Sequence, residues 1–361
     1  MIKISEPNIG DKEIKAVETV LKSGQLAQGS NVKIFEDMFS TYLGVKYSVA
    51  TSSGTTALQM ALLANNIGKG DEVITTGFTF VATVNSILSV GAKPVLVDID
   101  PITNNIDETL IEKYITKNTK AIMPVHLYGL SCNMDEIVNI AEKYNLIIIE
   151  DACQSLGSEF QSKKVGSFGV GCFSFYPTKN ITTGEGGMVC TNDDDVYEKL
   201  QLIRNHGMGQ SRYDYVALGF NFRMTDIQAT IGIVQLEKID SMLDSRIKNA
   251  RIYNDKLIKY VNIPFRNEKF LHVYNQYTIR INDKRRDLLK SFLDTKNIQT
   301  VVYYPHPVSH FDHVKDGSKI DSKLKNADKN SKEVLSLPVH PKLTNDELSY
   351  VISSIEEFFN E

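Results

Sequence analysis

The sequence predicts an α/β fold with a wide, mixed but mostly parallel sheet of seven strands, followed by a smaller C-terminal α+β domain. From about residue 46, short apolar runs alternate with helical stretches, which is typical of a parallel sheet covered by helices. Beyond a long amphipathic stretch, the pattern changes to separated strands and helices. The chain has 361 residues, 42% of them hydrophobic, more than one core usually holds. We therefore expect a large domain over residues 1–245 and a small one over residues 246–361.

The elements of the large domain follow from the spacing of its apolar residues. Runs rich in β-branched and aromatic residues predict the strands, at residues 47–50, 72–75, 94–97, 121–125, 146–150, 171–175 and 187–190. Apolar residues three and four positions apart predict the helices between them, at residues 55–64, 82–90 and 134–144.

The second domain begins with a connector. Residues 227–246 predict a long amphipathic helix that continues through residues 248–260 with a more charged face. The elements expected after it are strands at residues 274–281 and 301–304 and helices at residues 286–295 and 345–359. The polar residues 312–330 predict a surface loop or a short exposed helix.

Composition excludes several classes of protein. Lys and Arg number 40 against 44 Asp and Glu, so no strong positive field favours nucleic acid as a partner. We find neither a signal peptide nor a membrane span and expect a cytoplasmic protein. The four cysteines lack metal-ligand spacing, so we expect reduced thiols and no bound metal.

A candidate anion site lies in the run Ser52-Ser53-Gly54-Thr55-Thr56-Ala57-Leu58, which follows a strand and opens a helix. Small residues let backbone N–H groups approach a phosphate, and the helix N-terminus adds the positive end of its dipole. An ordinary Ser/Thr helix cap explains the same residues, and the segment alone does not decide between the two.

Two acids end the strand at residues 146–150. Ligands gather at the carboxyl ends of parallel strands, so Asp151 is a candidate site residue. A carboxylate there could hold a pyridine nitrogen in its protonated form. Glu150 points to the other side of the strand and is expected to be structural or solvated.

Lys179 is the third part of this constellation. It follows an aromatic strand, lies 28 residues beyond Asp151 and precedes the glycines of Thr182-Thr183-Gly184-Glu185-Gly186-Gly187. A partly desolvated amine is a nucleophile toward an aldehyde, although most lysines are solvated surface charges. Phosphate cradle, acid and lysine in this order predict pyridoxal 5'-phosphate as the cofactor.

These segments resemble the DegT-type nucleotide-sugar aminotransferases, which are fold-type-I pyridoxal phosphate enzymes. The resemblance runs from about residue 7 to the C-terminus. The matching runs are Ser53-Gly54-Thr55-Thr56-Ala57-Leu58, Gly70-Asp71-Glu72-Val73-Ile74, Phe78-Thr79-Phe80-Val81-Ala82-Thr83, Val125-His126-Leu127-Tyr128-Gly129, Glu150-Asp151-Ala152, residues 174–187, Gly219-Phe220-Asn221-Phe222-Arg223 and Ser336-Leu337-Pro338-Val339-His340-Pro341.

The resemblance implies roles for the matching residues. Lys179 would carry the cofactor as a Schiff base, Asp151 would pair with the ring nitrogen, Gln154 would lie near the ring hydroxyl, and Phe80 would stack on the ring. Ser53 belongs to the phosphate cradle, and Gly54, Thr55 and Ser174 match phosphate-binding positions. Asn221 would reach the phosphate of a neighbouring subunit, which implies a homodimer with shared active sites. Core packing for Phe80 and a turn for Asn221 remain alternatives.

Substrate contacts are expected from a further set of residues. His206 and Arg223 lie in a region that similar enzymes use near the active site, and a guanidinium matches a donor carboxylate bidentately. Tyr304 and His306 belong to a run that resembles the stretch closing the sugar-nucleotide side, although packing explains that run equally well.

The reaction implied is transfer of an amino group from L-glutamate, which leaves as 2-oxoglutarate, to a nucleoside-diphosphate keto-sugar. Residues 182–187 resemble members that aminate C4 of a 4-keto-6-deoxyhexose more than members acting at C3. Lysine at position 179 favours transfer over dehydration, because dehydrating members carry histidine there. The alternatives are a sugar 3-aminotransferase, a dehydratase or a non-catalytic regulatory protein.

Overall fold

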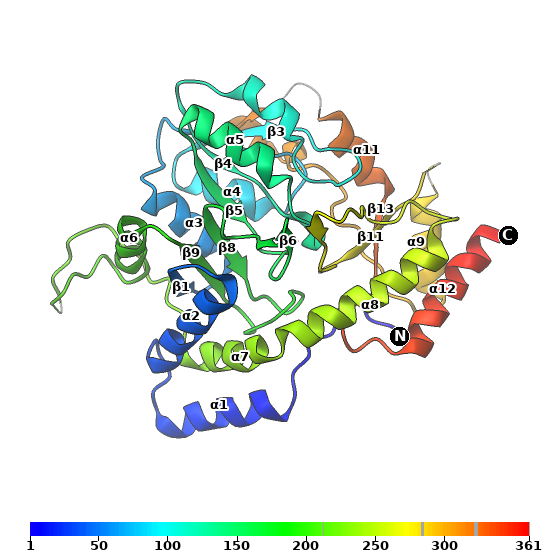
Figure 1. Cartoon of the computed structure of the whole chain (residues 1–361), viewed down its shortest axis with the longest axis horizontal. Helices are drawn as coiled ribbons and strands as arrows, with labels where there is room; N and C mark the ends of the chain where they lie inside the picture. Colours follow the sequence, from blue (N-terminus) through cyan, green and yellow to red (C-terminus); the bar gives the residue numbers. More distant parts are fainter. Residues whose placement is uncertain (212, 283–284, 321–323, 361) are drawn as a thin grey trace.

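The computed structural model describes residues 1–211, 213–282, 285–320 and 324–360 and contains a central sheet in the order β1-β9-β8-β5-β4-β2-β3-β12 (Figure 1). Within this sheet, β9 runs antiparallel to both neighbours and the other pairs are parallel. All seven predicted strands are present, and β12 is an unpredicted eighth. The strands are β1 (Tyr47–Thr51), β2 (Glu72–Thr76), β3 (Lys93–Val97), β4 (Thr119–Met123), β5 (Ile147–Asp151), β8 (Val170–Ser174), β9 (Gly187–Thr191) and β12 (Lys319–Ile320).

Helices cover both faces of the sheet. On one face, Val49, Ala121 and Ile149 pack with residues of α3 (Gly54–Ala64), α4 (Val81–Ser89) and α6 (Asp194–Arg204). Their sequence neighbours Ala50 and Ile148 point to the other face, where α2 (Ser30–Leu43), α5 (Met134–Tyr144) and α7 (Asp226–Glu237) lie. Burial on both sides explains why these strands are continuous apolar runs.

Shorter elements complete this part of the chain. Helices α1 and α2 are not among the predicted elements. The remaining members are α1 (Asp11–Ser23), the 3-10 helices η1 (Glu108–Tyr114) and η2 (Leu127–Gly129), and a small sheet of β6 (Glu159–Phe160), β7 (Lys163–Lys164) and β10 (Phe270–Leu271).

The prediction of one continuous connecting helix is wrong at Lys238. Helix α7 ends at Glu237, Lys238 departs from helical geometry with φ −112° and ψ 9°, and α8 (Ile239–Leu257) follows. Around the break, Gln235 Nε2 and Lys238 Nζ donate to the carbonyl of Asn8 at 2.9 and 2.7 Å. Side chains at the break therefore bind the N-terminal segment rather than continuing one helical face.

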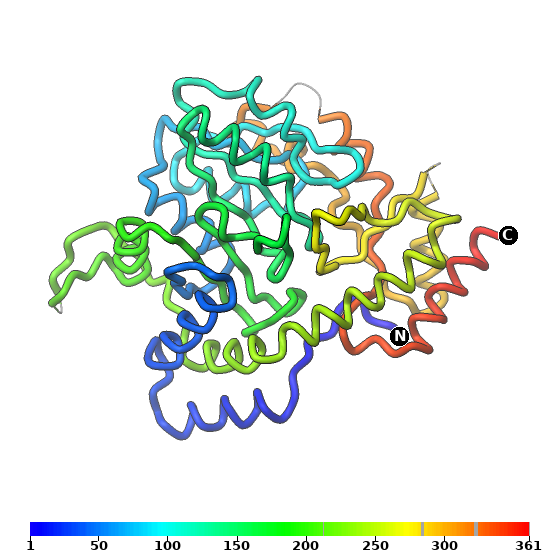
Figure 2. Tube along the Cα trace, in the orientation of Figure 1, coloured from blue at the N-terminus to red at the C-terminus, as the bar shows by residue number. Residues whose placement is uncertain are grey.

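Helix α8 leads from the large sheet into the C-terminal part (Figure 1). Met242 and Leu243 near its start pack in a cluster with residues of the large sheet, whereas Ala250 and Tyr253 pack in the C-terminal core. The domain division near residue 246 stays a prediction. Figure 2 shows both chain ends on the C-terminal side, where Ile2 pairs with Ile298.

The C-terminal core surrounds a two-stranded antiparallel sheet. Its elements are β11 (Tyr277–Arg280), β13 (Val334–Leu337), α9 (Arg286–Thr295) and α12 (Asn345–Asn360). The predicted strand at residues 301–304 is wrong, because only Val301 pairs, in an isolated bridge to Ser336. Tyr303 and Tyr304 instead pack against Phe78 and its neighbours in the large part.

Residues 308–333 return to the large sheet. They form η3 (Val308–His310), α10 (Asp312–Gly317), β12 and α11 (Lys325–Glu333). The expected short helix is α10, but the surface prediction for residues 312–330 fails where Val314 and Leu324 are buried and β12 pairs with β3. Residues 321–323 of that prediction lie outside the described residues. Every helix in the described ranges is too short or too polar to reach across a lipid bilayer.

Candidate active site

Asp151 ends β5 inside the molecule and is 5% exposed. Its Oδ2 accepts a hydrogen bond of 2.7 Å from Thr83 Oγ1, and its Oδ1 accepts one of 3.2 Å from the backbone N–H of Cys153. Thr83 Oγ1 also lies 2.8 Å from Thr79 Oγ1. The sequence motifs contain Thr79 and Thr83, but their contact with Asp151 was not predicted. Their spacing of four residues could have suggested that the two hydroxyls meet, but not that they meet Asp151.

Glu150, the neighbouring acid, is structural. Its side chain is fully buried and accepts backbone N–H groups of Gly166, Phe168 and Gly169 at 2.6, 2.7 and 2.9 Å. His126 Nδ1 accepts from the N–H of Cys132, so Nε2 carries the proton and donates to Glu150 at 3.1 Å. The expectation that Glu150 points away from the site is met, and it is buried rather than solvated.

Lys179 lies half-buried in the loop between β8 and β9. Its backbone N–H donates to the carbonyl of Tyr176 at 2.9 Å, and within the described ranges its amine makes no hydrogen bond or ion pair. Burial lowers the pKa of this amine, while the nearby Cys153 and Asp151 act in the opposite direction. An amine in this state is a better nucleophile than a solvated lysine.

Gly54 opens α3 directly beside the end of β8. A Cβ at this position would lie 2.7 Å from Ser174 Cβ and 2.9 Å from Cys153 Sγ, so only glycine allows this approach. Ser53 caps α3, because its hydroxyl accepts from the N–H of Thr56 at 3.1 Å, and Thr55 is exposed. The helix cap and the phosphate cradle are therefore compatible, since the cap is made by the serine hydroxyl and Thr55 stays exposed.

Gln154, Tyr304 and Phe80 form the aromatic side of the site. Gln154 Nε2 donates to the hydroxyl of Tyr304 at 2.9 Å, and its Oε1 accepts from the N–H of Tyr128 at 2.8 Å. The Phe80 ring lies 6.1 Å from that of Tyr304 and is 55% exposed. The core-packing alternative for Phe80 is therefore wrong, and its exposed ring is available to a planar ligand.

The predicted substrate residues do not all join this group. Arg223 Nη1 donates to Asn205 Oδ1 at 2.5 Å, Asn205 pairs with Asn221, and His206 lies next to Asn205 with a positive φ of 58°. Within the described residues, no hydrogen bond or ion pair joins these side chains to Lys179 or Asp151. The cluster nevertheless borders the cradle, because the N–H of Ser52 donates to the carbonyl of Phe222 at 2.9 Å.

His306 is exposed and stacks on His310, with ring centres 5.4 Å apart. Tyr304 is thus the predicted residue of this run that contacts the site.

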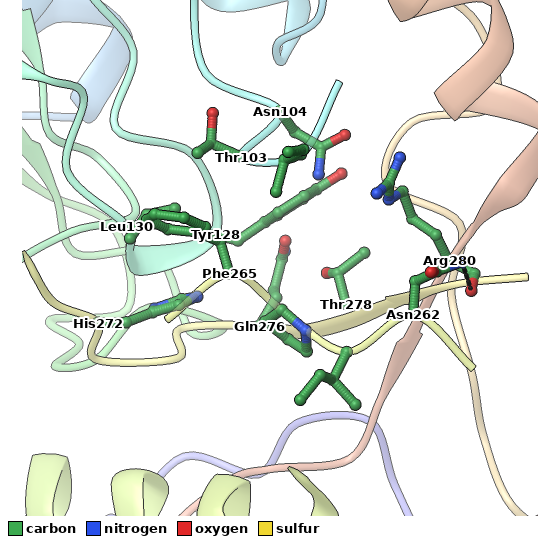
Figure 3. Close-up of a pocket in the computed structure, with 13 residues that line it drawn as sticks. Thr103, Asn104, Tyr128, Leu130, Asn262, Phe265, His272, Gln276, Thr278 and Arg280 are labelled. Atoms are coloured by element: carbon green, nitrogen blue, oxygen red, sulfur yellow. Dashed lines mark hydrogen bonds between the residues drawn. The ribbon is translucent and has the colours of Figure 1, made fainter. Parts of the chain in front are cut away.

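A separate small cavity of about 20 Å³ adjoins Tyr128 on the side toward the C-terminal part (Figure 3). Figure 3 shows His272, Gln276 and Thr278 facing Tyr128 and Leu130 across it. None of the predicted site residues lines this cavity, which has room for about one water molecule. Tyr128 is therefore shared between the cavity and the Gln154 side of the site.

The residues brought together fit pyridoxal phosphate. Gly54 and Ser174 leave a tight cradle at a helix N-terminus for a phosphate, Asp151 supplies a buried carboxylate, and Lys179 supplies an amine without a partner in the described ranges. The exposed ring of Phe80 provides a stacking surface.

Comparison with known proteins gives a consistent result. Residues 7–356 match the model of the DegT/DnrJ/EryC1/StrS aminotransferase family. The "Pleiotropic regulatory protein" of Geobacillus stearothermophilus is 41% identical over 96% of this chain and 94% of its own length. The GDP-perosamine synthase of Caulobacter vibrioides is 40% identical over 99% of this chain and 98% of its own length.

A third relative and a solved structure are also similar to this chain. The UDP-2-acetamido-2-deoxy-3-oxo-D-glucuronate aminotransferase of Pseudomonas aeruginosa is 38% identical, with 98% of each chain covered. The PLP-form of Spr1654 from Streptococcus pneumoniae superposes with a TM-score of 0.94 at 29% identity, covering 99% of this chain and 98% of that one.

Proposed function

The chain belongs to the DegT/DnrJ/EryC1/StrS aminotransferase family, and we propose that it moves an amino group from L-glutamate to the keto carbon C4 of a nucleoside-diphosphate-linked 6-deoxyhexose. It is a pyridoxal phosphate-dependent sugar aminotransferase. The glutamate donor and the 4-keto acceptor are the finer parts of the proposal. The observation that carries it is the Lys179 amine, which lacks a hydrogen-bond partner in the described ranges and lies near enough to the buried carboxylate of Asp151 for that charge to act on its pKa.

Pyridoxal phosphate, when bound, supplies an aldehyde and an electron sink for the donor's α-carbon. We assign Asp151 to hold the ring nitrogen in its protonated form and Phe80 to cover the ring. Gln154 would lie at the ring hydroxyl, with its amide fixed by Tyr304 and Tyr128. The phosphate would be held by Ser53, Gly54, Thr55 and Ser174, together with Asn221 of a second copy.

Lys179 has two tasks in this proposal. Its amine attaches to the cofactor, and after displacement by the donor it accepts the proton from the donor's α-carbon at Nζ. Both tasks need the uncharged amine, and burial shifts the pKa of Lys179 in that direction. Arg223 and His206 are proposed to contact substrate, with Arg223 facing a donor carboxylate. Tyr304 and His306 are proposed on the sugar-nucleotide side.

The nucleotide and the 4-keto carbonyl of the acceptor have separate support. The name of one relative, GDP-perosamine synthase, specifies a nucleoside-diphosphate-linked product and supports the nucleotide. The 4-keto carbonyl is supported by residues 182–187, which resemble members that act at C4. A sugar 3-aminotransferase is the second candidate, because another relative is named for a 3-oxo sugar substrate. A regulatory role is favoured by the name of a third relative, but Lys179 and Asp151 together support catalysis.

We also propose a homodimer whose copies share their active sites. Exposed apolar side chains support it, on α1 and α2 (Ile14, Leu21 and Ile34 at 60, 54 and 47%) and on the segment after α6 (Val216 and Leu218 at 60 and 77%). That segment extends away from the sheet (Figure 1). Mixing Lys179→Ala chains with Asn221→Ala chains should restore activity if Asn221 acts across the interface, and should not if it acts within one chain.

A cytoplasmic location is proposed from the cysteines. All four are free, and three are buried. Reduced thiols of this kind fit a reducing compartment.

The test of the proposed function has two steps. Protein saturated with pyridoxal phosphate is mixed with L-glutamate, and the absorbance of the lysine-bound cofactor and the formation of 2-oxoglutarate are followed. A panel of nucleotide-linked 4-keto and 3-keto sugars is then offered. Amination of a 4-keto sugar is expected. Turnover of 3-keto sugars alone would establish a sugar 3-aminotransferase. Loss of a hydroxyl from the sugar would establish a dehydratase. No change in absorbance with any amino acid would establish the regulatory role.

A further inference from the structure

The two residues flanking Lys179 are held by one buried amide from the C-terminal part of the chain. Asn275, 5% exposed, donates from Nδ2 to the carbonyl of Thr178 at 3.2 Å and to Oδ1 of Asn180 at 3.1 Å. An amide nitrogen has two hydrogens, and both are used here. One NH₂ group therefore bridges the chain immediately before and after the reactive lysine.

The hydrogen-bond network fixes the orientation of both amides. Asn180 Nδ2 donates to the carbonyl of Leu156 at 2.9 Å, which leaves its Oδ1 as the acceptor for Asn275. The carbonyl of Thr178 can only accept. Asn275 must therefore present its NH₂ group, and an oxygen in that place would face two acceptors.

Asn275 is in turn fixed by its own surroundings. The backbone carbonyl of Asn275 accepts a hydrogen bond from Arg246 Nη1 at 3.2 Å. The backbone carbonyl of the preceding residue, Tyr274, accepts from the same nitrogen at 3.4 Å. Arg246 is 4% exposed and has no carboxylate within ion-pair distance among the described residues. Burying an unpaired guanidinium is costly, and the two hydrogen bonds that hold this backbone account for its burial.

The same segment also contacts the other side of the site. The N–H of Val273 donates to the carbonyl of Gly129 at 3.0 Å, and that of Gln276 to the carbonyl of Tyr128 at 3.2 Å. A Cβ on Gly129 would lie 2.8 Å from the nitrogen of Asn275, so the two backbones are in direct contact. Tyr128 binds Gln154, and Figure 3 shows Gln276 facing Tyr128. Residues 273–276 therefore touch both the lysine loop and the Gln154 side.

We propose that Asn275 is a positioning residue for Lys179. By tying Thr178 and Asn180 together, it sets the direction in which the lysine side chain leaves its loop, and it couples that direction to the seating of residues 273–276. An amine that both attaches to a cofactor and transfers a proton needs a fixed position, and a displacement of about 1 Å can cost up to a hundredfold in rate. This inference rests on the proposed function for its kinetic consequence.

The test uses the isosteric change Asn275→Asp, which removes both donations, and Asn275→Ala, which removes them without adding charge. Asn330→Asp is the matched control, because Asn330 is fully buried and also donates from one NH₂ group to two acceptors, the carbonyl of Pro101 at 3.1 Å and Oδ1 of Asn104 at 2.7 Å, neither of which flanks Lys179. We expect both Asn275 variants, at full cofactor occupancy, to lower the single-turnover rate with glutamate by about tenfold to a hundredfold, with little change in the half-saturating glutamate concentration. The control should keep the parent's rate.

Hydrogen exchange of residues 178–183 in cofactor-free protein provides a readout that is independent of the reaction. Exchange in this segment should be about tenfold faster in both Asn275 variants and unchanged in Asn330→Asp. Parent-like exchange with a parent-like rate would overturn the inference, as would a rate that falls only in proportion to lost cofactor occupancy. If the parent fails to react with any amino acid, the proposed function fails, and the exchange comparison still decides the role of Asn275.

Discussion

Thr83 Oγ1 donates a hydrogen bond of 2.7 Å to Asp151 Oδ2 in the interior of the protein. A carboxylate can only accept, so the hydroxyl of Thr83 is committed to Asp151 and Thr79 donates to Thr83 at 2.8 Å. This pair of hydroxyls fixes the direction in which Asp151 presents its carboxylate.

The change Thr83→Val keeps the shape of the side chain and removes this bond. We expect about 1–2 kcal/mol lower stability and about a tenfold slower reaction with glutamate, followed by stopped-flow absorbance. Thr75→Val is the control, because Thr75 is buried and its hydroxyl donates to the carbonyl of Met123 at 2.8 Å instead of to Asp151. Equal rates in the two variants would contradict a role for Thr83 in catalysis.

Replacing Lys179 tests the centre of the site. Lys179→Arg keeps a positive charge but cannot attach to the cofactor, and Lys179→Ala removes the amine. We expect both to lose the absorbance of the lysine-bound cofactor and to lose turnover by on the order of a thousandfold or more. Turnover of keto-sugar at the parent's rate in either variant would show that another group carries the chemistry.

The cradle is tested by Gly54→Ala. The new Cβ would meet Ser174 Cβ at 2.7 Å and Cys153 Sγ at 2.9 Å, so α3 and β8 must separate. We expect the dissociation constant of pyridoxal phosphate, measured by fluorescence titration, to rise by about tenfold or more. Gly68→Ala is the control, since its Cβ would meet only the carbonyl of Val90 at 3.5 Å. Unchanged affinity in Gly54→Ala would remove this segment from the phosphate site.

The lowered pKa of Lys179 predicts a pH dependence. In cofactor-free protein, only the uncharged amine reacts with the aldehyde of pyridoxal phosphate. Because burial lowers the pKa of this amine below 10.5, the reaction rate should rise with pH and level off below the pH at which an exposed lysine does. The measurement is the rate of absorbance change after adding cofactor across the pH range. A rate still rising at pH 10.5 would contradict the assignment.

Glu150→Gln should lower the stability of the fold strongly and change the rate of reaction with glutamate little. The carboxylate accepts three backbone N–H groups and His126, and a glutamine would turn an NH₂ group toward donors. We expect about 2–4 kcal/mol lower stability by denaturant titration. The remaining folded protein, once saturated with cofactor, should react with glutamate at nearly the parent's rate. A large rate loss without a stability loss would place Glu150 in the mechanism.

Much of the large sheet could be predicted because its strands are buried on both faces and are locally encoded by β-branched residues. Asp151 and Lys179 could be proposed as site residues for a similar reason, since each stands at a fixed place relative to its own strand. The continuous helix across Lys238 failed because the side chains around that residue bind the distant Asn8. Local periodicity contains no information about such a partner.

The contacts between site residues were harder to predict than the residues themselves. Gln154 meets Tyr304 across 150 positions, and Asn275 meets Asn180 across 95. Cys153 comes two residues after Asp151, yet its closeness to Gly54 and Lys179 depends on how α3 and the ends of β5 and β8 come together. Such relationships arise from tertiary packing and leave no local pattern.

The short strand β12 comes from the C-terminal part of the chain but covers the edge of the large sheet, so the large sheet cannot be separated from the C-terminal residues without exposing that edge. A sheet edge with unpaired backbone groups recruits strands of other molecules. A fragment of residues 1–245 would lack β12 and so present β3 as a bare edge, with Leu96 and Phe78 deprived of their cover from Val314 and Leu324. Such a fragment would self-associate, so the C-terminal residues protect the protein against aggregation while also supplying Tyr304 to the site.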